Sequence, residues 1–233
     1  MAALARRHHL PSSSTDRFLR LLEALASEPG PPTSVTDPHE AAEVHLADSL
    51  SGLDVEPLRE ATSIVDLGAG AGFPGLVLAV ALPHARVDLV ESSRHKCETI
   101  ERLRAAAGAA NARAIPERAE EWGRGAGAGA YRAATARALA PLAVLCEYAV
   151  PVLELGGALV CWKGSRDAGE EAAGARAATE VGLELAEIRP VAPFPASRNR
   201  HLHAFVKVAP TPSRFPRRAG MAVKRPLGGG DGR

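Results

Sequence analysis

The residues best suited to hold a cofactor lie in one glycine-rich segment, Asp66–Gly75, directly after a short apolar run. Glycines in such a place let the backbone turn tightly and approach a ligand where a β-carbon would collide. Two patterns fit the segment. The dinucleotide-binding spacing G-x-G-x-x-G is met by Gly70, Gly72 and Gly75. The acidic-x-Gly-x-Gly-x-Gly spacing of S-adenosylmethionine (SAM) enzymes is met by Asp66, Gly68, Gly70 and Gly72.

The charge of Asp66 distinguishes the two patterns. A carboxylate is repelled by a pyrophosphate but attracted by the ammonium group of a methionine. The chain has 233 residues, which suits one large domain and leaves no room for a separate hydride-acceptor domain. We therefore favour SAM over a dinucleotide, and a structural turn without a ligand is the third interpretation. Glu91, nineteen residues after Gly72 and at the end of a second apolar run, is expected to bind the ribose hydroxyls.

Apolar runs and helical patterns alternate along the chain after residue 60. Strands are predicted at 63–67, 86–91, 112–115, 131–136 and 157–163, and helices at 74–82, 94–107, 141–153 and 167–181. Two further strands, 183–191 and 201–208, are expected to be antiparallel neighbours. This alternation predicts a doubly wound, Rossmann-like α/β fold with helices on both faces of the sheet. Helices at 15–27 and about 37–53 are expected to form an N-terminal helical extension over residues 1–60.

The composition argues against several other classes of protein. The hydrophobic fraction is 46%, but 46 residues are alanine, so the core must be built largely from small side chains. Cys97, Cys146 and Cys161 are odd in number and lack metal-ligand spacing, which argues against a disulfide framework and against a bound metal. The sequence has no signal-peptide pattern and no apolar stretch of about 18 residues. We therefore predict a cytoplasmic protein without a membrane association.

The formal net charge of +1 conceals a polarised distribution. From Arg198 to Arg233, nine basic residues accompany one acid, which gives this part +8 and the remaining residues −7. A basic arm on an acidic body often binds nucleic acid, although such an arm can also serve solubility alone. Residues 210–233 are rich in proline and glycine and poor in apolar side chains. We predict that they form a flexible arm after a cofactor-binding domain at 61–209.

Several motifs, in order along the chain, resemble those of the RsmG (GidB) proteins, bacterial methyltransferases of small-subunit ribosomal RNA. The stretches that carry the resemblance are His45–Leu50 (HLADSL), Asp66–Gly75 (DLGAGAGFPG), Arg118–Glu121 (RAEE), Ala136–Leu142 (ARALAPL), Lys163-Gly164, Arg200–Leu202 (RHL), and Phe215–Gly220 (FPRRAG) with Arg225–Leu227 (RPL). The resemblance implies SAM-dependent methylation of N7 of a guanine in the 530 loop of 16S rRNA. The implied partner is that RNA or the 30S subunit, and nothing indicates an obligate protein partner.

The resemblance also implies a set of cofactor-binding residues. Together with the turn residues Asp66, Gly70 and Gly72, the predicted set is Gly68, Phe73, Glu91, Ser92, Ser93, Ala119, Glu120 and Arg137. Two departures from the family pattern lie in the helical extension. Pro31-Pro32-Thr33 stands where Asn-Leu-Thr is common, and Val44 stands where a basic residue often precedes the histidine. Substrate contacts in this region, and the role of His45 as a core, capping or functional residue, stay open.

The implied reaction places few demands on proton transfer. Guanine N7 presents a lone pair, so it can attack a sulfonium methyl group without a general base, and alignment supplies most of the catalysis. Arg137 is expected to position the methionine carboxylate, an RNA phosphate or the guanine O6, or alternatively to pair with an acid of a neighbouring loop. RNA contacts are predicted for Lys163, Arg200, His201, Arg217 and Arg218. The alternative functions are a non-catalytic RNA- or ribosome-binding protein and a dinucleotide-dependent oxidoreductase.

Overall fold

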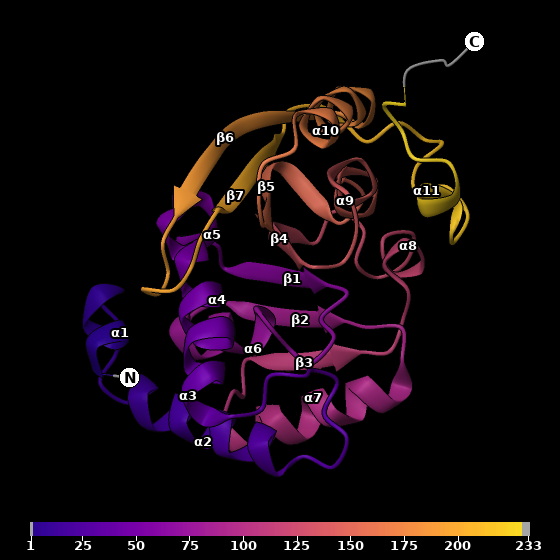
Figure 1. Ribbon diagram of the computed structural model, residues 1–233. Coiled ribbons are helices and arrows are strands. Elements are labelled where there is room, and N and C mark those ends of the chain that lie inside the picture. Colours follow the sequence, from indigo (N-terminus) through magenta and orange to yellow (C-terminus); the bar gives the residue numbers. More distant parts are fainter. Residues whose placement is uncertain (1, 230–233) are drawn as a thin grey trace.

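The computed structural model describes residues 2–229 and is built around a seven-stranded sheet (Figure 1). The strands are β1 (Ser63–Leu67), β2 (Arg86–Val90), β3 (Ala112–Ile115), β4 (Tyr131–Arg137), β5 (Leu153–Lys163), β6 (Leu183–Val191) and β7 (Arg200–Lys207). Their order is β3-β2-β1-β4-β5-β7-β6. Strands β1 to β5 pair in parallel, and β7 lies antiparallel between β5 and β6. The doubly wound α/β prediction is confirmed.

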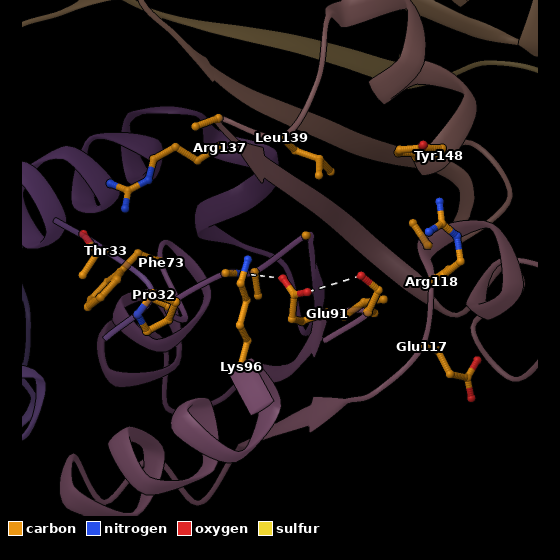
Figure 2. A pocket seen from close by; sticks show the side chains of 18 of the residues that line it. Pro32, Thr33, Phe73, Glu91, Lys96, Glu117, Arg118, Arg137, Leu139 and Tyr148 are labelled. Carbon is orange, nitrogen blue, oxygen red and sulfur yellow. Dashed lines mark hydrogen bonds between the residues drawn. The ribbon is translucent and has the colours of Figure 1, made fainter. Parts of the chain in front are cut away.

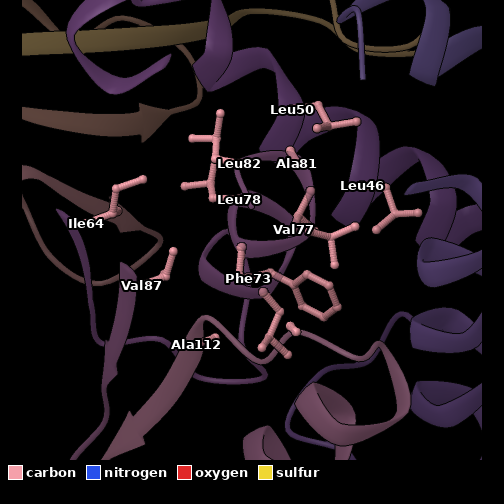
Figure 3. Close-up of a cluster of buried hydrophobic side chains, with 14 of the residues drawn as sticks. Leu46, Leu50, Ile64, Phe73, Val77, Leu78, Ala81, Leu82, Val87 and Ala112 are labelled. Atoms are coloured by element: carbon pink, nitrogen blue, oxygen red, sulfur yellow. The ribbon is translucent and has the colours of Figure 1, made fainter. Parts of the chain in front are cut away.

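Helices cover both faces of the sheet because neighbouring strand residues point to opposite sides. Ile64 belongs to one buried apolar cluster and Val65 to the other. The first cluster includes side chains of α2 (Ser14–Ser27), α6 (Gly75–Ala81) and α7 (Arg94–Ala106), and Figure 3 shows its centre around Phe73 and Leu78. The second includes side chains of α8 (Ala119–Trp122), α9 (Leu142–Ala149) and α10 (Ala168–Val181). Helix α9 ends earlier than predicted because Pro151 follows it closely and β5 begins at Leu153.

The helices before β1 share the first cluster with the sheet. The predicted helix at 37–53 is a helical run with several geometries, namely α3 (Pro38–Ala41), the π-helical η1 (Ala42–Ala47), α4 (Asp48–Leu50) and the 3₁₀ turn η2 (Ser51–Asp54). Asp37 caps its start by accepting hydrogen bonds from two backbone N–H groups. Leu46 and Leu50 of this run are fully buried against α6. Two short helices, α1 (Ala2–Arg7) and α5 (Glu56–Arg59), were not predicted.

The segment that follows β7 is packed, which corrects the prediction of a flexible arm at 210–233. Its described part, through residue 229, contains α11 (Met221–Lys224). Phe215 and Ala222 are buried in the second cluster, near α9. Figure 1 shows this segment beside α8 and α10. Composition misled the prediction because a few buried apolar side chains, together with ion pairs and hydrogen bonds to the body, dock a segment that is otherwise rich in proline, glycine and charge.

Two other observations concern the cysteines and the length of the helices. Cys97, Cys146 and Cys161 are buried free thiols. Across the described residues, no helix combines the length and apolar character needed to cross a bilayer.

Candidate active site

A pocket of about 460 Å³ opens at the carboxyl ends of the parallel strands, where the strand order reverses between β1 and β4. Open α/β sheets bind ligands at this switch point. The loops after β1, β2, β3 and β4 all contribute to the pocket, with additions from the N-terminal region and α9 (Figure 2). Its lining residues are Pro32, Thr33, His45, Gly68, Ala69, Gly70, Ala71, Phe73, Val90, Glu91, Ser92, Lys96, Glu117, Arg118, Ala119, Glu120, Arg137, Ala138, Leu139 and Tyr148.

The glycine turn after β1 forms one wall of the pocket. Gly68 and Gly70 have φ angles of +66° and +58°, which side-chain-bearing residues rarely adopt. A β-carbon at Gly68 would collide with Leu139, which follows β4. A β-carbon at Gly70 would meet no atom nearer than 3.9 Å, so the space above this backbone is open to the pocket. The turn therefore combines the backbone conformation and the access that a bound ligand needs.

Asp66 supports this turn from below and does not line the pocket. Its Oδ2 accepts a hydrogen bond from the Gly75 N–H at 2.9 Å, and its Oδ1 accepts one from the Thr135 hydroxyl at 2.9 Å. Burial raises the pKa of Asp66 to about 6, although both hydrogen bonds oppose the rise. Asp66 was predicted to attract the cofactor's ammonium group through bound water or the backbone. Its carboxylate joins β1, α6 and β4 and does not line the pocket, so it can act on a ligand only through the turn that it supports.

Gly72 and Ser93 also lie outside the pocket lining. Gly72, with a φ angle of +93°, packs against Leu76 and shapes the turn. Ser93 caps α7 through its side chain, which accepts a hydrogen bond from the Lys96 N–H. Gly72 and Ser93, which were predicted to bind the cofactor, therefore shape the backbone around the pocket and do not line it.

Glu91 lines the pocket directly after β2, at the strand end where the sequence placed it. Its Oε2 accepts a hydrogen bond from the Gly70 N–H at 3.1 Å, and its Oε1 accepts one from the Ser93 N–H at 2.9 Å. The carboxylate is thus held between the two loops (Figure 2). Each carboxylate oxygen can accept a further hydrogen bond, so Glu91 remains able to bind a pair of hydroxyls.

His45 and Phe73 form a stacked pair at the opposite side of the pocket. Their ring centroids are 4.4 Å apart and the planes differ by 7°. His45 Nδ1 lies 3.3 Å from Arg137 Nη2, and its Nε2 lies 3.1 Å from the Val35 carbonyl oxygen. A guanidinium only donates and a carbonyl only accepts, so Nδ1 is unprotonated and the proton resides on Nε2. Burial, aided by the charge of Arg137, lowers the pKa of His45 to about 4, so the ring is neutral near pH 7.

Arg137 reaches the pocket from the end of β4 but is anchored by the N-terminal helices. Its Nη1 donates hydrogen bonds to Asp48 Oδ2 and to the Val44 carbonyl oxygen, both at 3.0 Å. The Arg137 side chain is 15% exposed and Asp48 is 1% exposed, so this ion pair is nearly shielded from water. Asp48 was not singled out from the sequence, although it stands three residues after His45 on a helical run. π-helical turns such as η1 frequently mark functional sites.

The basic residues predicted to contact RNA do not line the pocket. Lys163 pairs with Glu170 at 2.6 Å, and Arg200 lies 3.6 Å from Asp48 Oδ1. The His201 ring lies 3.1 Å from the Gly164 carbonyl oxygen.

Arg217 and Arg218 are neighbours with opposite environments. Arg217 forms a two-pronged ion pair with the buried Glu147 of α9, which corrects its predicted role as an RNA contact. Arg218 is exposed, and no ion pair to it is found among residues 2–229. Of this pair, only Arg218 offers its charge to solvent.

Ala119 and Glu120, for which the resemblance implied cofactor binding, line the pocket after β3. Glu120 is 1% exposed, and its Oε1 accepts hydrogen bonds from the Gly220 N–H at 2.7 Å and from Arg118 at 3.4 Å. Burial raises the pKa of Glu120, but these two interactions, together with a hydrogen bond from its own backbone N–H, outweigh burial, and the pKa is lowered. Within residues 2–229, no three histidine, cysteine or acidic side chains converge into a metal site.

Lining residues that the sequence did not indicate include Lys96, Glu117, Leu139 and Tyr148. Lys96 comes from the first turn of α7, and Leu139 lies two residues after Arg137, within the Ala136–Leu142 motif. Ala138, between Arg137 and Leu139, has a φ angle of +54°, an uncommon value for alanine. The sequence held one signal for Leu139, namely its place in the Ala136–Leu142 motif in the turn after β4, since the turn after a strand often carries binding residues.

Comparison with known proteins agrees with this geometry. The chain matches the family described as "GidB: rRNA small subunit methyltransferase G" over residues 14–194. A ribosomal RNA small subunit methyltransferase G of Synechococcus elongatus is 39% identical over 200 residues, covering 84% of this chain and 82% of that protein. Its counterpart in Pelotomaculum thermopropionicum is 40% identical over 198 residues with the same coverage.

A solved structure of the fibrillarin pre-rRNA processing protein of Methanococcus jannaschii has a TM-score of 0.54 at 17% identity, covering 70% of this chain and 74% of that chain. This likeness concerns the fold alone. The family match, by contrast, spans every loop that lines the pocket. It excludes the dinucleotide interpretation, and the chain belongs to the rRNA small subunit methyltransferase G (GidB) family of SAM-dependent methyltransferases.

Proposed function

We propose that the protein transfers the methyl group of SAM to N7 of a guanine in the 530 loop of 16S rRNA, either in the RNA or in the 30S subunit. The reaction belongs in the cytoplasm, where small subunits are assembled. The observation that carries the proposal is the pocket at the switch point. In this pocket the Glu91 carboxylate is fixed between two loops, and the backbone at Gly70 is accessible to a ligand.

The residues present fit SAM. Glu91 retains acceptor capacity for the two ribose hydroxyls, and the exposed backbone of the glycine turn can approach the methionine part. The loop with Ala119 and Glu120 lies after the neighbouring strand β3, where it can contact the adenine. When bound, SAM supplies a methyl group on a sulfonium centre as the electrophile.

The protein's own residues are suited to a transfer that requires positioning and no proton abstraction. His45 is neutral, and both of its ring nitrogens are engaged, since Nε2–H donates to the Val35 carbonyl and Nδ1 accepts from Arg137. It therefore neither adds a charge nor offers a free base. Arg137 is held by Asp48 and Val44 and presents a fixed cation at the pocket edge. A fixed donor orients a carboxylate, phosphate or guanine O6 without a reorganisation cost. N7 needs no base, so alignment by these groups accounts for the catalysis.

RNA affinity in this proposal comes from exposed cations. Arg218 is exposed and has no ionic partner among residues 2–229, whereas the neighbouring Arg217 is paired with Glu147. Lys96 and Arg118 line the pocket mouth and can meet a phosphate near the target base. Binding through such contacts weakens steeply with increasing salt.

The test is to map the methyl group. Deproteinised 16S rRNA and 30S subunits from cells lacking this methylation are incubated with the protein and isotopically labelled SAM, and N7-methylguanosine is located by chemical strand cleavage. We expect one labelled guanine in the 530 loop of at least one substrate. Label at another atom or another loop contradicts the proposed specificity. SAM binding and RNA binding without any transfer would instead support the non-catalytic RNA-binding function.

A further inference from the structure

The described residues after β7 fold into a compact unit that is tied to the body by buried contacts. Phe215 is 7% exposed and packs in the cluster that also contains Tyr148. Arg217 donates from Nε to Glu147 Oε1 at 2.9 Å and from Nη2 to Glu147 Oε2 at 2.5 Å. The same guanidinium donates to the Arg225 carbonyl oxygen at 2.8 Å. We call residues 215–225 the C-terminal clasp.

The clasp makes a direct hydrogen bond to a residue that lines the pocket. The Gly220 N–H donates to Glu120 Oε1 at 2.7 Å, which is the shortest hydrogen bond to that carboxylate. Gly220 has a φ angle of +79°, which an L side chain rarely adopts. No atom lies within 4 Å of where its β-carbon would be, so glycine is required here for backbone direction and not for space.

A second connection reaches the pocket through α9. Glu147, the partner of Arg217, is followed by Tyr148, which lines the pocket. Burial raises the pKa of the Tyr148 phenol, and the charge of Glu120 adds to the rise. The clasp therefore binds Glu120, which lines the pocket, and Glu147, which precedes Tyr148 in α9.

We propose that the C-terminal clasp is part of the cofactor site and that Arg217 and Gly220 are positioning residues for SAM, acting through Glu147 and Glu120. This inference rests on the proposed function. The buried carboxylate of Glu120 keeps its orientation only while the Gly220 N–H is in place. Arg217 keeps the clasp docked and compensates the charge of Glu147. The two adjacent arginines of the clasp thus have different roles: Arg217 faces inward and pairs with Glu147, and Arg218 faces the solvent, where it can contact RNA.

The test compares two adjacent arginines. Arg217→Ala removes the inward contact, and Arg218→Ala is the matched control, with the same change of charge at an exposed position. The dissociation constant of S-adenosylhomocysteine is measured by calorimetry, that of deproteinised 16S rRNA by filter binding, and amide exchange at 118–120 by mass spectrometry. For Arg217→Ala we expect about tenfold weaker S-adenosylhomocysteine binding, as expected for losing hydrogen bonds between charged groups. Faster exchange at 118–120 should accompany it. Arg218→Ala should change only RNA binding.

Gly220→Ala provides a second variant that keeps the Arg217 ion pair. The substitution strains the backbone and displaces the N–H from Glu120 without filling occupied space. It should weaken S-adenosylhomocysteine binding even if Arg217→Ala unfolds. If folded Gly220→Ala binds S-adenosylhomocysteine with wild-type affinity and shows unchanged amide exchange at 118–120, the proposed role of the clasp in the cofactor site is wrong. A wild-type protein that binds S-adenosylhomocysteine but methylates no guanine overturns the proposed function alone. A wild-type protein that does not bind it overturns both.

Discussion

The ion pair between Asp48 and Arg137 provides a test of how the N-terminal helices act on the pocket. The perturbation is Asp48→Asn, which keeps the size of the side chain and one acceptor oxygen but removes the charge. Arg137 Nη1 would lose the negative charge of its partner at 3.0 Å, and Arg200 would lose the same charge at the longer distance of 3.6 Å. The Arg137 side chain is only 15% exposed, so water cannot replace the lost charge fully.

The magnitude follows from this burial. Breaking a fully buried pair costs about 3–5 kcal/mol, and the partly exposed Arg200 adds less than about 1 kcal/mol. Because asparagine retains an acceptor for Arg137, we expect a loss of about 2 kcal/mol, nearer to a charged hydrogen bond. For a chain of this size that lowers Tm by roughly 4–8 °C. Methyl transfer should fall further than stability, because Arg137 loses its fixed position.

The assay is thermal unfolding of the protein alone, followed by initial rates of methyl transfer at a temperature where both proteins are folded. Glu43→Gln is the control, since it removes one negative charge from an exposed position of the same helical run. If Asp48 acts through Arg137, then Asp48→Asn combined with Arg137→Ala should lose less than the sum of the two single losses. Full additivity, or an Asp48→Asn protein with wild-type Tm and rate, refutes the reasoning.

Three further predictions follow from the pocket. Arg137→Ala should fold, as judged by circular dichroism, but transfer methyl groups at least tenfold more slowly; wild-type rates would remove its positioning role. Gly68→Ala should reduce stability by about 1–2 kcal/mol in urea denaturation and weaken SAM binding, because φ is +66° and the new methyl group meets Leu139; unchanged binding would contradict the geometry of the turn. The folded pKa of His45, about 4, lies below the unfolded value of 6.5, so its stabilising contribution is complete above pH 6.5 and is lost as the pH falls toward 4. Between pH 7 and pH 5 the wild type should therefore lose about 1–2 kcal/mol more in urea denaturation than His45→Gln, and parallel losses would show that the ring is not held neutral.

Local sequence signals predicted the elements and the wall of the pocket. The apolar runs at 63–67 and 112–115 are strands with the predicted bounds, and the glycine turn lies where a cofactor site was expected. These features depend on residues that are near neighbours in the chain, such as an apolar strand followed by glycines. Glu91 was found for the same reason, since the end of the next strand of a parallel sheet must lie beside the turn.

Such local signals could not identify the hydrogen-bond partners of the site residues. Arg137 bonds to Asp48 across 89 positions, and Glu120 bonds to the Gly220 N–H across 100. Sequence periodicity carries no information on which side chain meets which across these separations. It could not show, for example, that Asp66 would turn toward Gly75 and Thr135 instead of the pocket. The net charge of the tail likewise did not show which basic residues are exposed. Arg217 is paired with the buried Glu147, whereas the adjacent Arg218 is exposed.

The two supports of the pocket have a consequence for the time at which the protein becomes competent. Asp48, near the start of the chain, holds Arg137 on one side, and the Gly220 N–H holds Glu120 on the other. During synthesis on the ribosome, the four loops of the pocket are all made before residue 150, yet the second support does not exist until residue 220 has emerged. A nascent chain can thus contain every residue that lines the pocket while Glu120 still lacks this support. Complete assembly of the site is delayed until the chain has been synthesised beyond its last strand.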